Sequence, residues 1–245
     1  MNLTIDIGNS LVKVIVFDDT NPVFRKVYKR LTPLQINRLR KNFNITGGMV
    51  SSVIKVNKAI DKALIKIPNF RTLSSSVPLP VKNLYKTPET LGNDRLANAV
   101  AAAFLYPGKN VLVIDAGTCV KYDFINSDNE YIGGSISPGM EMRFKALHKF
   151  TGRLPLVKEM NVKVMTGITT ESAIQTGVMI GMIEEIKGFI TRYNMKYPLV
   201  KVILTGGDAH HFEEELNLSI FAAADLVNIG LNQIIKFNAG KKPKK

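Results

Sequence analysis

The chain has 245 residues, a hydrophobic content of 45% and a formal net charge of +13. This composition fits one large domain or two of moderate size, and no apolar run approaches the ~20 residues that cross a membrane. The single Cys119 excludes an internal disulfide framework and favours a reducing, cytoplasmic setting, and Asp6 comes too early for a signal peptide. The positive net charge favours anionic substrates. We expect no membrane partner. We also expect no nucleic-acid partner, because no nucleic-acid-binding module is recognised.

The first half of the sequence predicts alternating strands and helices. Runs of apolar and β-branched residues predict strands at 2–7, 12–18, 22–29 and 49–53. Helical spacing and alanine content predict helices at 33–41, 57–67 and 96–104. The first of these helices should begin at Thr32-Pro33, where threonine can cap the helix and proline suits its first position.

The second half repeats this pattern. Strands are predicted at 111–116, 119–126, 130–136 and 201–204. Helices are predicted at 140–150 and at 223–238, and a long helix with an apolar stripe is predicted to begin at Thr170. Gly133 to Gly139 is expected to form a glycine-rich turn ahead of the helix at 140–150, and Thr169 to Ser172 is expected to cap the long helix.

The turn after the strand at 111–116 carries the motif Asp115-Ala116-Gly117-Thr118. Glycine lets backbone amides approach an anion, and a turn of exposed amides can hold a phosphate. The carboxylate would repel phosphate unless a cation lies between them, so the motif predicts a metal–nucleotide site. On its own, the motif favours a plain hairpin, because Asp and Gly are ordinary turn residues.

A second copy of this motif lies near the N-terminus. Asp6-Ile7-Gly8-Asn9-Ser10 again interrupts two apolar strands, and Val12-Lys13 aligns with Val120-Lys121 after a gap of one residue. Two equivalent strand–turn–strand segments, one opening each half, indicate a duplicated fold.

A third motif, Gly92-Asn93-Asp94-Arg95, lies at the start of the alanine-rich helix, where exposed amides favour anions. The motif has a purely structural alternative, in which Asp94 is a helix cap and Arg95 pairs with a charge on the surface.

Taken together, the order and spacing of four motifs resemble type III pantothenate kinases. The motifs are Asp6-Ile7-Gly8-Asn9-Ser10, Gly92-Asn93-Asp94-Arg95, Asp115-Ala116-Gly117-Thr118 and Thr205-Gly206-Gly207-Asp208. Two further pairs match family patterns, namely Tyr85 with Pro88 and Gly133-Gly134 with Pro138-Gly139. The likeness extends from Met1 to about Phe237. Ser10 stands where threonine is usual and Cys119 where alanine is common; the serine keeps the hydroxyl.

The resemblance implies an α/β fold of the actin, sugar-kinase and heat-shock-chaperone ATPase superfamily. Two duplicated ribonuclease-H-like domains, 1–106 and 107–245, would each contain a mixed sheet flanked by helices, with a nucleotide cleft between them. The implied reaction transfers the γ-phosphoryl group of ATP to pantothenate, giving 4'-phosphopantothenate in the first step of coenzyme A biosynthesis.

The resemblance also implies roles for individual residues. Asp94 would be the catalytic base. Pantothenate would contact Tyr85, Gly92, Asn93, Asp94, Arg95 and Thr170, although Thr169 and Thr176 are close enough to confuse the register of the last contact. ATP phosphates would be held by Asp6, Ile7, Gly8, Asn9, Ser10, Leu11, Val12, Lys13 and Thr118.

The expected cofactors are Mg²⁺ near Asp6, arriving with ATP, and a monovalent cation, K⁺ or NH₄⁺, at Asp115. Family members are homodimers, and the interface is expected on the long helix that begins at Thr170. Two alternatives stay open: a nucleotide-binding regulator without turnover, and a superfamily kinase acting on another small alcohol such as a sugar.

Overall fold

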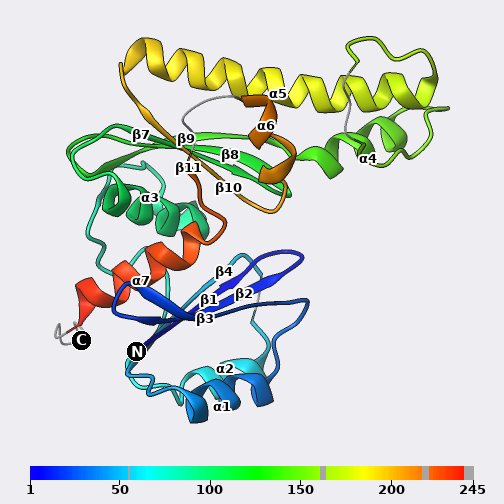
Figure 1. Ribbon diagram of the computed structural model, residues 1–245. Helices are drawn as coiled ribbons and strands as arrows, with labels where there is room; N and C mark the ends of the chain where they lie inside the picture. Colours follow the sequence, from blue (N-terminus) through cyan, green and yellow to red (C-terminus); the bar gives the residue numbers. More distant parts are fainter. Residues whose placement is uncertain (55, 161–163, 217–220, 240–245) are drawn as a thin grey trace. The chain divides into compact units, whose positions relative to one another are not determined.

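The computed structural model describes residues 1–54, 56–160, 164–216 and 221–239. The chain forms two compact units. Unit 1 contains Met1–Pro107, Asp128–Tyr131 and Asp225–Lys245, and unit 2 contains Gly108–Ser127 and Ile132–Ala224. Each unit has a mixed β-sheet with flanking helices (Figure 1), which confirms the predicted α/β class. No described helix combines the length and the apolar character that a membrane crossing needs.

Unit 1 is built on a five-stranded sheet in the order β3-β2-β1-β4-β5. Its strands are β1 (Asn2–Ile7), β2 (Val12–Asp18), β3 (Asn21–Tyr28), β4 (Gly47–Ser52) and β5 (Phe70–Thr72). β1 pairs antiparallel with β2 and parallel with β4. Helices α1 (Pro33–Asn42) and α2 (Lys58–Leu64) cover one face of this sheet (Figure 1), where Ile36 and Leu64 are fully buried.

The predicted start of α1 is confirmed. The Thr32 side chain accepts a hydrogen bond from the Gln35 backbone amide, and the Gln35 side chain accepts one from the Thr32 amide. These reciprocal bonds satisfy two backbone donors that have no partner within the helix. The hydrogen bonds between Thr32 and Gln35 therefore explain why α1 begins at Pro33.

Unit 1 also contains α3 (Asn93–Leu105), the 3-10 turn Pro88–Thr90, β6 (Lys82–Asn83) and α7 (Leu226–Asn238). α7 packs closely on α3, because a Cβ added at Gly230 would lie 1.9 Å from the carbonyl oxygen of Ala97. Asn228 of α7 also donates a hydrogen bond to the Thr4 hydroxyl of β1. The contacts thus place α7 with unit 1, unlike the division at residue 107 that the sequence suggested.

Unit 2 contains strands in the order β11-β10-β7-β8-β9. The elements are β7 (Val111–Ala116), β8 (Cys119–Ile125), β9 (Glu130–Pro138), α4 (Met140–Phe150), α5 (Thr170–Lys196), β10 (Lys201–Thr205), α6 (Glu213–Leu216) and β11 (Phe221–Ala222). β7 pairs antiparallel with β8 and parallel with β10. The first two residues of β9, which belong to unit 1, pair with β6.

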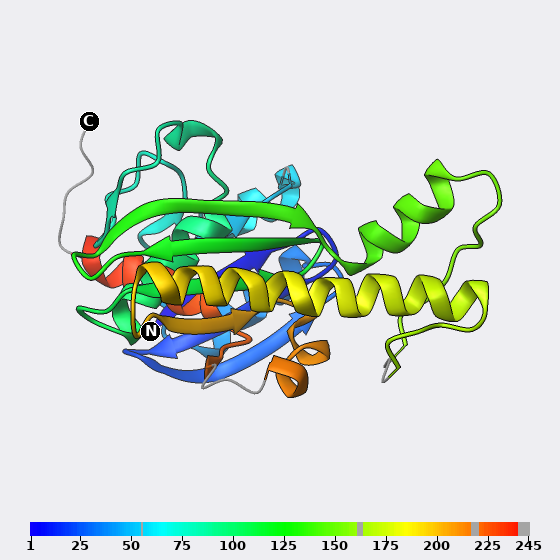
Figure 2. The same ribbon diagram turned by 90° about the horizontal axis from the view of Figure 1, so that it is seen from above.

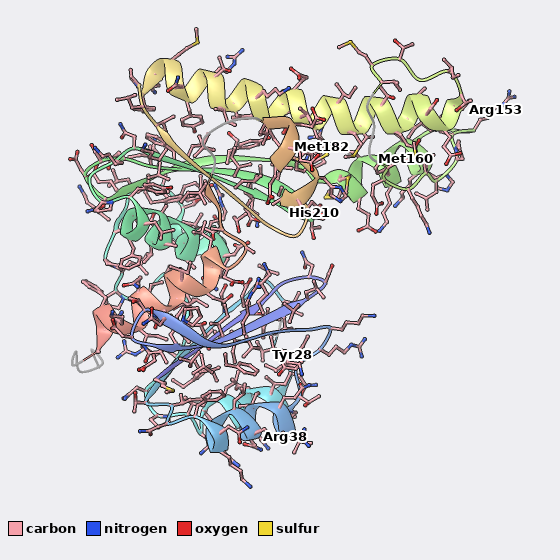
Figure 3. All side chains as sticks on the ribbon, viewed as in Figure 1. Tyr28, Arg38, Arg153, Met160, Met182 and His210 are labelled. Atoms are coloured by element: carbon pink, nitrogen blue, oxygen red, sulfur yellow. The ribbon has the colours of Figure 1, made fainter. Side chains whose placement is uncertain are left out.

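The long helix α5 lies across the unit 2 sheet, and its N-terminal part extends past the sheet beside α4 (Figure 2). Met182 and Ile186 of this helix are buried. Figure 3 shows Met182 directed toward the sheet, whereas Arg153 and Met160 lie in the segment between α4 and α5, away from the sheet. α5 therefore has one buried stretch and one end that the sheet does not cover.

Two local predictions need correction. The glycine-rich turn expected at 133–139 is instead the continuous strand β9, which runs to Pro138. A Cβ at Gly134 would lie 1.8 Å from the carbonyl oxygen of Tyr122, so this glycine permits a close approach between strands. The helix predicted at 57–67 ends at Leu64, and the chain then turns through a bond from the Ile67 amide to the Leu64 carbonyl.

Candidate active site

The first Asp-x-Gly motif forms the turn between β1 and β2. Asp6 lies opposite Lys13 in the antiparallel register, and the Gly8 amide donates to the Leu11 carbonyl over 3.0 Å. The tip residues Asn9 to Leu11 are exposed. A carboxylate and a lysine thus flank a tight turn with an exposed tip.

The second motif forms the equivalent turn between β7 and β8. Asp115 lies opposite Lys121, so the register repeats that of Asp6 and Lys13 and agrees with the predicted duplication. The Lys121 ammonium lies 2.7 Å from the Asp115 carboxylate, and both side chains are largely buried. The Gly117 amide donates to the Cys119 carbonyl, and Thr118 is exposed. The pairing of Asp115 with Lys121 was not predicted.

Two glycine motifs from distant parts of the sequence pack on the second turn. The Gly139 amide donates to the Thr118 carbonyl, and a Cβ at Gly139 would lie 2.1 Å from the Gly117 carbonyl oxygen. Gly206 has a φ of +102°, and a Cβ there would lie 2.0 Å from the Ala116 carbonyl oxygen. Only glycine permits backbones to approach so closely, and it also tolerates positive φ. The backbone of the turn is therefore held from two sides.

A polar cluster missed by the sequence analysis fixes the junction between β9 and α4. Glu185 accepts hydrogen bonds from Tyr122 at 2.8 Å and from Ser137 at 2.5 Å, and it forms an ion pair with Arg143. The Arg143 Nε also donates to the Pro138 carbonyl over 2.8 Å. This cluster ties α5 to the residue that precedes Gly139.

The interactions within this cluster shift the pKa values of Glu185 and Tyr122. Burial tends to raise the pKa of Glu185, but the hydrogen bonds from Ser137, Arg143 and Tyr122 together lower it. Burial, assisted by the nearby Glu185 carboxylate, raises the pKa of Tyr122, so its hydroxyl keeps its proton as a donor. The sequence did contain one signal for this cluster. Glu185 follows Met182 by three residues, which places it on the same buried face of the helix.

Asp94 lies in the first turn of α3 but is not its N-cap. Gly92 is the N-cap, and the Asp94 carboxylate accepts a hydrogen bond from the Arg95 amide over 2.9 Å. A Cβ at Gly92 would lie only 2.5 Å from the Asp94 carboxylate oxygen, so glycine leaves room for this carboxylate. The Asp94 carboxylate therefore lies at the N-terminal end of α3, where backbone amides without partners in the helix are located.

Arg95 and Tyr85 lie together beside this helix start. Arg95 is 4% exposed, and its guanidinium carbon lies 5.6 Å from the centroid of the Tyr85 ring. This burial contradicts the alternative that Arg95 pairs with a charge on the surface. The Tyr85 ring also lies 6.1 Å from that of Tyr131. Unit 1 therefore brings together the predicted residues Tyr85, Gly92, Asp94 and Arg95.

Comparisons with known proteins extend this description. The sequence pattern of the family described as type III pantothenate kinase matches residues 2–192. A protein of Phocaeicola vulgatus named type III pantothenate kinase is 49% identical over 241 residues, covering 97% of this chain and 99% of the relative. A protein of the same name from Bacteroides fragilis is 47% identical over 243 residues, covering 98% and 100%.

The chain belongs to the type III pantothenate kinase family. The fold is shared more widely. The solved structure of an activator of the 2-hydroxyisocaproyl-CoA dehydratase from Clostridium difficile, with bound ADPNP, is 10% identical with a TM-score of 0.56. It covers 100% of this chain and 98% of its own. At this identity, the likeness shows the fold alone.

Three threonines near the start of α5 were candidates for one predicted substrate contact in this family member. Thr169 is the N-cap and accepts from the Ser172 amide over 3.1 Å, and Thr176 is buried. Thr170 is the first helical residue and is exposed. Its position favours Thr170 as the hydroxyl that a ligand could reach.

The expected cations can be tested against the donor atoms. Within the described residues, no three His, Cys, Asp or Glu side chains gather into a metal site. Mg²⁺ that arrives with a nucleotide commonly needs one or two carboxylates and keeps several waters, so Asp6 fits that requirement. Asp115 already pairs with Lys121, so a monovalent cation there would share the carboxylate with an ammonium group.

Proposed function

We propose that the chain is a kinase that transfers the γ-phosphoryl group of ATP to the terminal hydroxyl of pantothenate, giving 4'-phosphopantothenate. This reaction is the first step of coenzyme A biosynthesis. The observation that carries the proposal is the arrangement at the start of α3 in a chain of this family: the Asp94 carboxylate accepts from the Arg95 amide, and the buried Arg95 guanidinium lies over the Tyr85 ring. A cytoplasmic location, where a free thiol such as Cys119 stays reduced, is part of the proposal.

Asp94 is proposed to take the proton from the attacking hydroxyl. Phosphoryl transfer needs little covalent help from the protein, but it needs alignment, charge neutralisation and a group that accepts the alcohol proton. A carboxylate within hydrogen-bond reach of the attacking hydroxyl can accept that proton. Gly92 supports this role because it leaves space next to the carboxylate.

Arg95 and Tyr85, together with Gly92, Asn93 and Thr170, are proposed to bind pantothenate. The guanidinium group is planar and matches the two oxygens of a carboxylate. Tyr85 offers an apolar ring with a polar tip, which suits a small amphipathic substrate. The packing of Tyr85 against Tyr131 and Arg95 would hold the ring in one orientation.

The two Asp-x-Gly turns are proposed to bind the phosphates of ATP. In unit 1 the turn from Asp6 to Lys13 offers exposed tip residues and a lysine. In unit 2 Thr118 offers an exposed hydroxyl on a turn held by Gly139 and Gly206. Rigid placement matters because misplaced groups lose much of their contribution to the rate.

Asp6 is proposed to hold the Mg²⁺ of the nucleotide through water, and Asp115 is proposed to hold K⁺ or NH₄⁺. When bound, these ions neutralise phosphate charge. Lys121 already compensates the charge of Asp115 in this structure. The cation would therefore add to this compensation.

A homodimer formed through α5 is proposed from the surface of unit 2. Met165 and Ile168, which precede α5, are 81% and 93% exposed, and Phe150 at the end of α4 is 80% exposed. A Cβ at Gly177 or Gly181 would meet no atom within 4 Å, so this side of α5 has open space for a second helix. These exposed apolar side chains and the open side of α5 support the proposed interface.

A coupled assay of ADP release, with and without pantothenate, tests the activity. Release that requires pantothenate supports the proposal. Release with a sugar or another alcohol but not with pantothenate would indicate a different kinase. ATP binding without any release would indicate a regulator. Asp94→Asn serves as the matched inactive control, because it keeps the shape of the side chain.

A further inference from the structure

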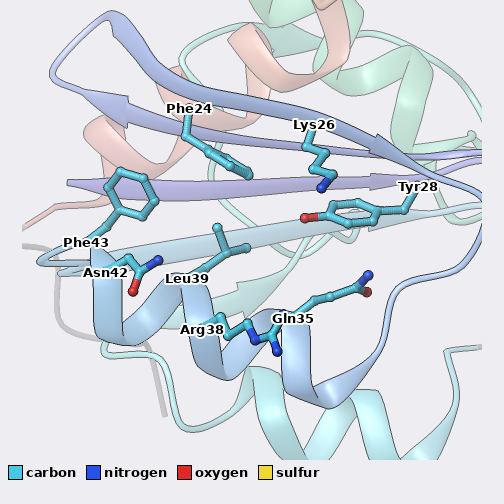
Figure 4. Close-up of a pocket in the computed structure, with 8 residues that line it drawn as sticks. All are labelled: Phe24, Lys26, Tyr28, Gln35, Arg38, Leu39, Asn42 and Phe43. Atoms are coloured by element: carbon cyan, nitrogen blue, oxygen red, sulfur yellow. The ribbon is translucent and has the colours of Figure 1, made fainter.

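A groove between the edge strand β3 and helix α1 of unit 1 has no part in the proposed function. Its volume is about 260 Å³, and it is lined by alternate residues of β3 and by the face of α1 that ends at Phe43 (Figure 4). Ligand sites commonly range from about 300 to 1,000 Å³, so this groove lies just below the lower end of that range. It therefore suits a small ligand, such as one ring with a short substituent.

One end of this groove is apolar. The rings of Phe24 and Phe43 lie 5.6 Å apart with their planes tilted by 56°, and buried Leu39 of α1 lies next to them (Figure 4). Both rings are only half-buried, so part of their surface faces the groove. Aromatic rings favour tilted or offset partners, which makes this end suitable for a third ring.

The other end is cationic. Lys26 and Tyr28 lie side by side on β3, and Arg38 projects from α1 (Figure 4). The Lys26 ammonium lies 5.3 Å from the centroid of the Tyr28 ring. Burial raises the pKa of Tyr28, which keeps its hydroxyl protonated as a donor. These groups offer donors but no carboxylate.

The sequence makes the charge of this groove one-sided. The chain has no Asp or Glu between Asp19 and Asp61, whereas Lys and Arg recur on both β3 and α1 in that interval. No acidic side chain from these elements can neutralise Lys26 and Arg38, so an anion is the complementary ligand.

We propose that this groove binds a small aromatic anion from solution. The ligand would carry a carboxylate or phosphate between Lys26 and Arg38, joined by a short arm to one ring that packs on Phe24 and Phe43. The ring would gain apolar contact, and the anion would receive charge-assisted hydrogen bonds. Neither part of the ligand alone would fill both ends.

The test is an NMR titration of the ¹⁵N-labelled full chain with 3-phenylpropionate and with phenyl phosphate, in the presence of saturating ATP and pantothenate. We expect saturable shifts of backbone amides within residues 24–28 and 35–43. Propionate, which lacks the ring, and 3-phenylpropionamide, which lacks the charge, should each bind at least about tenfold more weakly.

Arg38→Gln should raise the Kd of the aromatic anion about tenfold, because it removes one charged donor from an exposed position. Arg40→Gln is the matched control: it makes the same change on the same helix, two residues away, outside the groove lining.

Four outcomes would overturn the proposal: no saturable binding, equal binding of propionate or the amide, shifts confined to other residues, and equal effects of the two variants. Displacement of the aromatic anion by tighter binding of an oligothymidylate would identify a nucleic-acid surface instead.

Discussion

Replacing Gly139 with alanine tests whether the turn at Asp115–Thr118 depends on its close contact with the start of α4. A Cβ at this position would lie 2.1 Å from the Gly117 carbonyl oxygen and 2.5 Å from that of Thr118. An ordinary van der Waals contact begins at 3.4 Å, so the two backbones must separate by about 1.3 Å, the difference between 3.4 and 2.1. No side-chain rotation can relieve this clash, because both partners are backbone atoms.

The expected effects of Gly139→Ala follow from this displacement. Overpacking of well-packed interiors costs about 1–3 kcal/mol. For a chain of this length, each kcal/mol lowers Tm by about 2–4 °C. A shift of about 1 Å in a group that positions substrate can cost about 10²-fold in rate. We therefore expect a folded protein with a modestly lower Tm and a kcat/KM for ATP about 10²-fold lower.

The assay combines thermal unfolding with coupled ADP release at varied ATP. Gly152→Ala is the control, because a Cβ there meets no atom within 4 Å. A Gly139→Ala variant with wild-type Tm and kcat/KM would refute the packing argument. A variant with a lowered Tm but full activity would retain the packing argument and remove the proposed role of Thr118 in phosphate binding.

Further predictions concern the base, the cation, the interface and the polar cluster. Asp94→Asn should lower kcat by about 10²–10⁴-fold without loss of fold or ATP binding; a near wild-type rate would leave Asp94 a purely structural role. Activity in sodium-only buffer at matched ionic strength should be very low; full activity would remove the cation role of Asp115. Gly181→Arg, compared with Gly152→Arg, should give monomers by light scattering that bind ATP but phosphorylate pantothenate poorly, and a fully active monomer would show that activity does not depend on the proposed homodimer. Glu185→Gln should destabilise the fold by about 2 kcal/mol at neutral pH. Because the pKa of Glu185 is lowered on folding, the difference from wild type should persist above about pH 4.5 and shrink below it in denaturant titrations, and a pH-independent difference would contradict this.

The sequence by itself determined the features that depend on near neighbours. The apolar runs located the paired strands β1 and β2, and β7 and β8, and the alignment of Lys13 with Lys121 matches their observed register opposite Asp6 and Asp115. The capping pattern located the start of α1 and that of α5, where Thr169 is bonded to Ser172. Hydrogen bonds between adjacent strands or within one helix turn follow from residues a few positions apart, so a local pattern suffices to predict them.

The tertiary structure alone decided which distant residues meet. The sequence contained Gly139 and Gly206, but only the fold shows that each lies against the backbone of the turn at Asp115–Thr118. Likewise, only the fold buries Arg95 beside Tyr85 and joins Arg143 to Glu185. A close approach of two backbones depends on how whole strands and helices pack, and no periodicity or spacing within one segment encodes that distance.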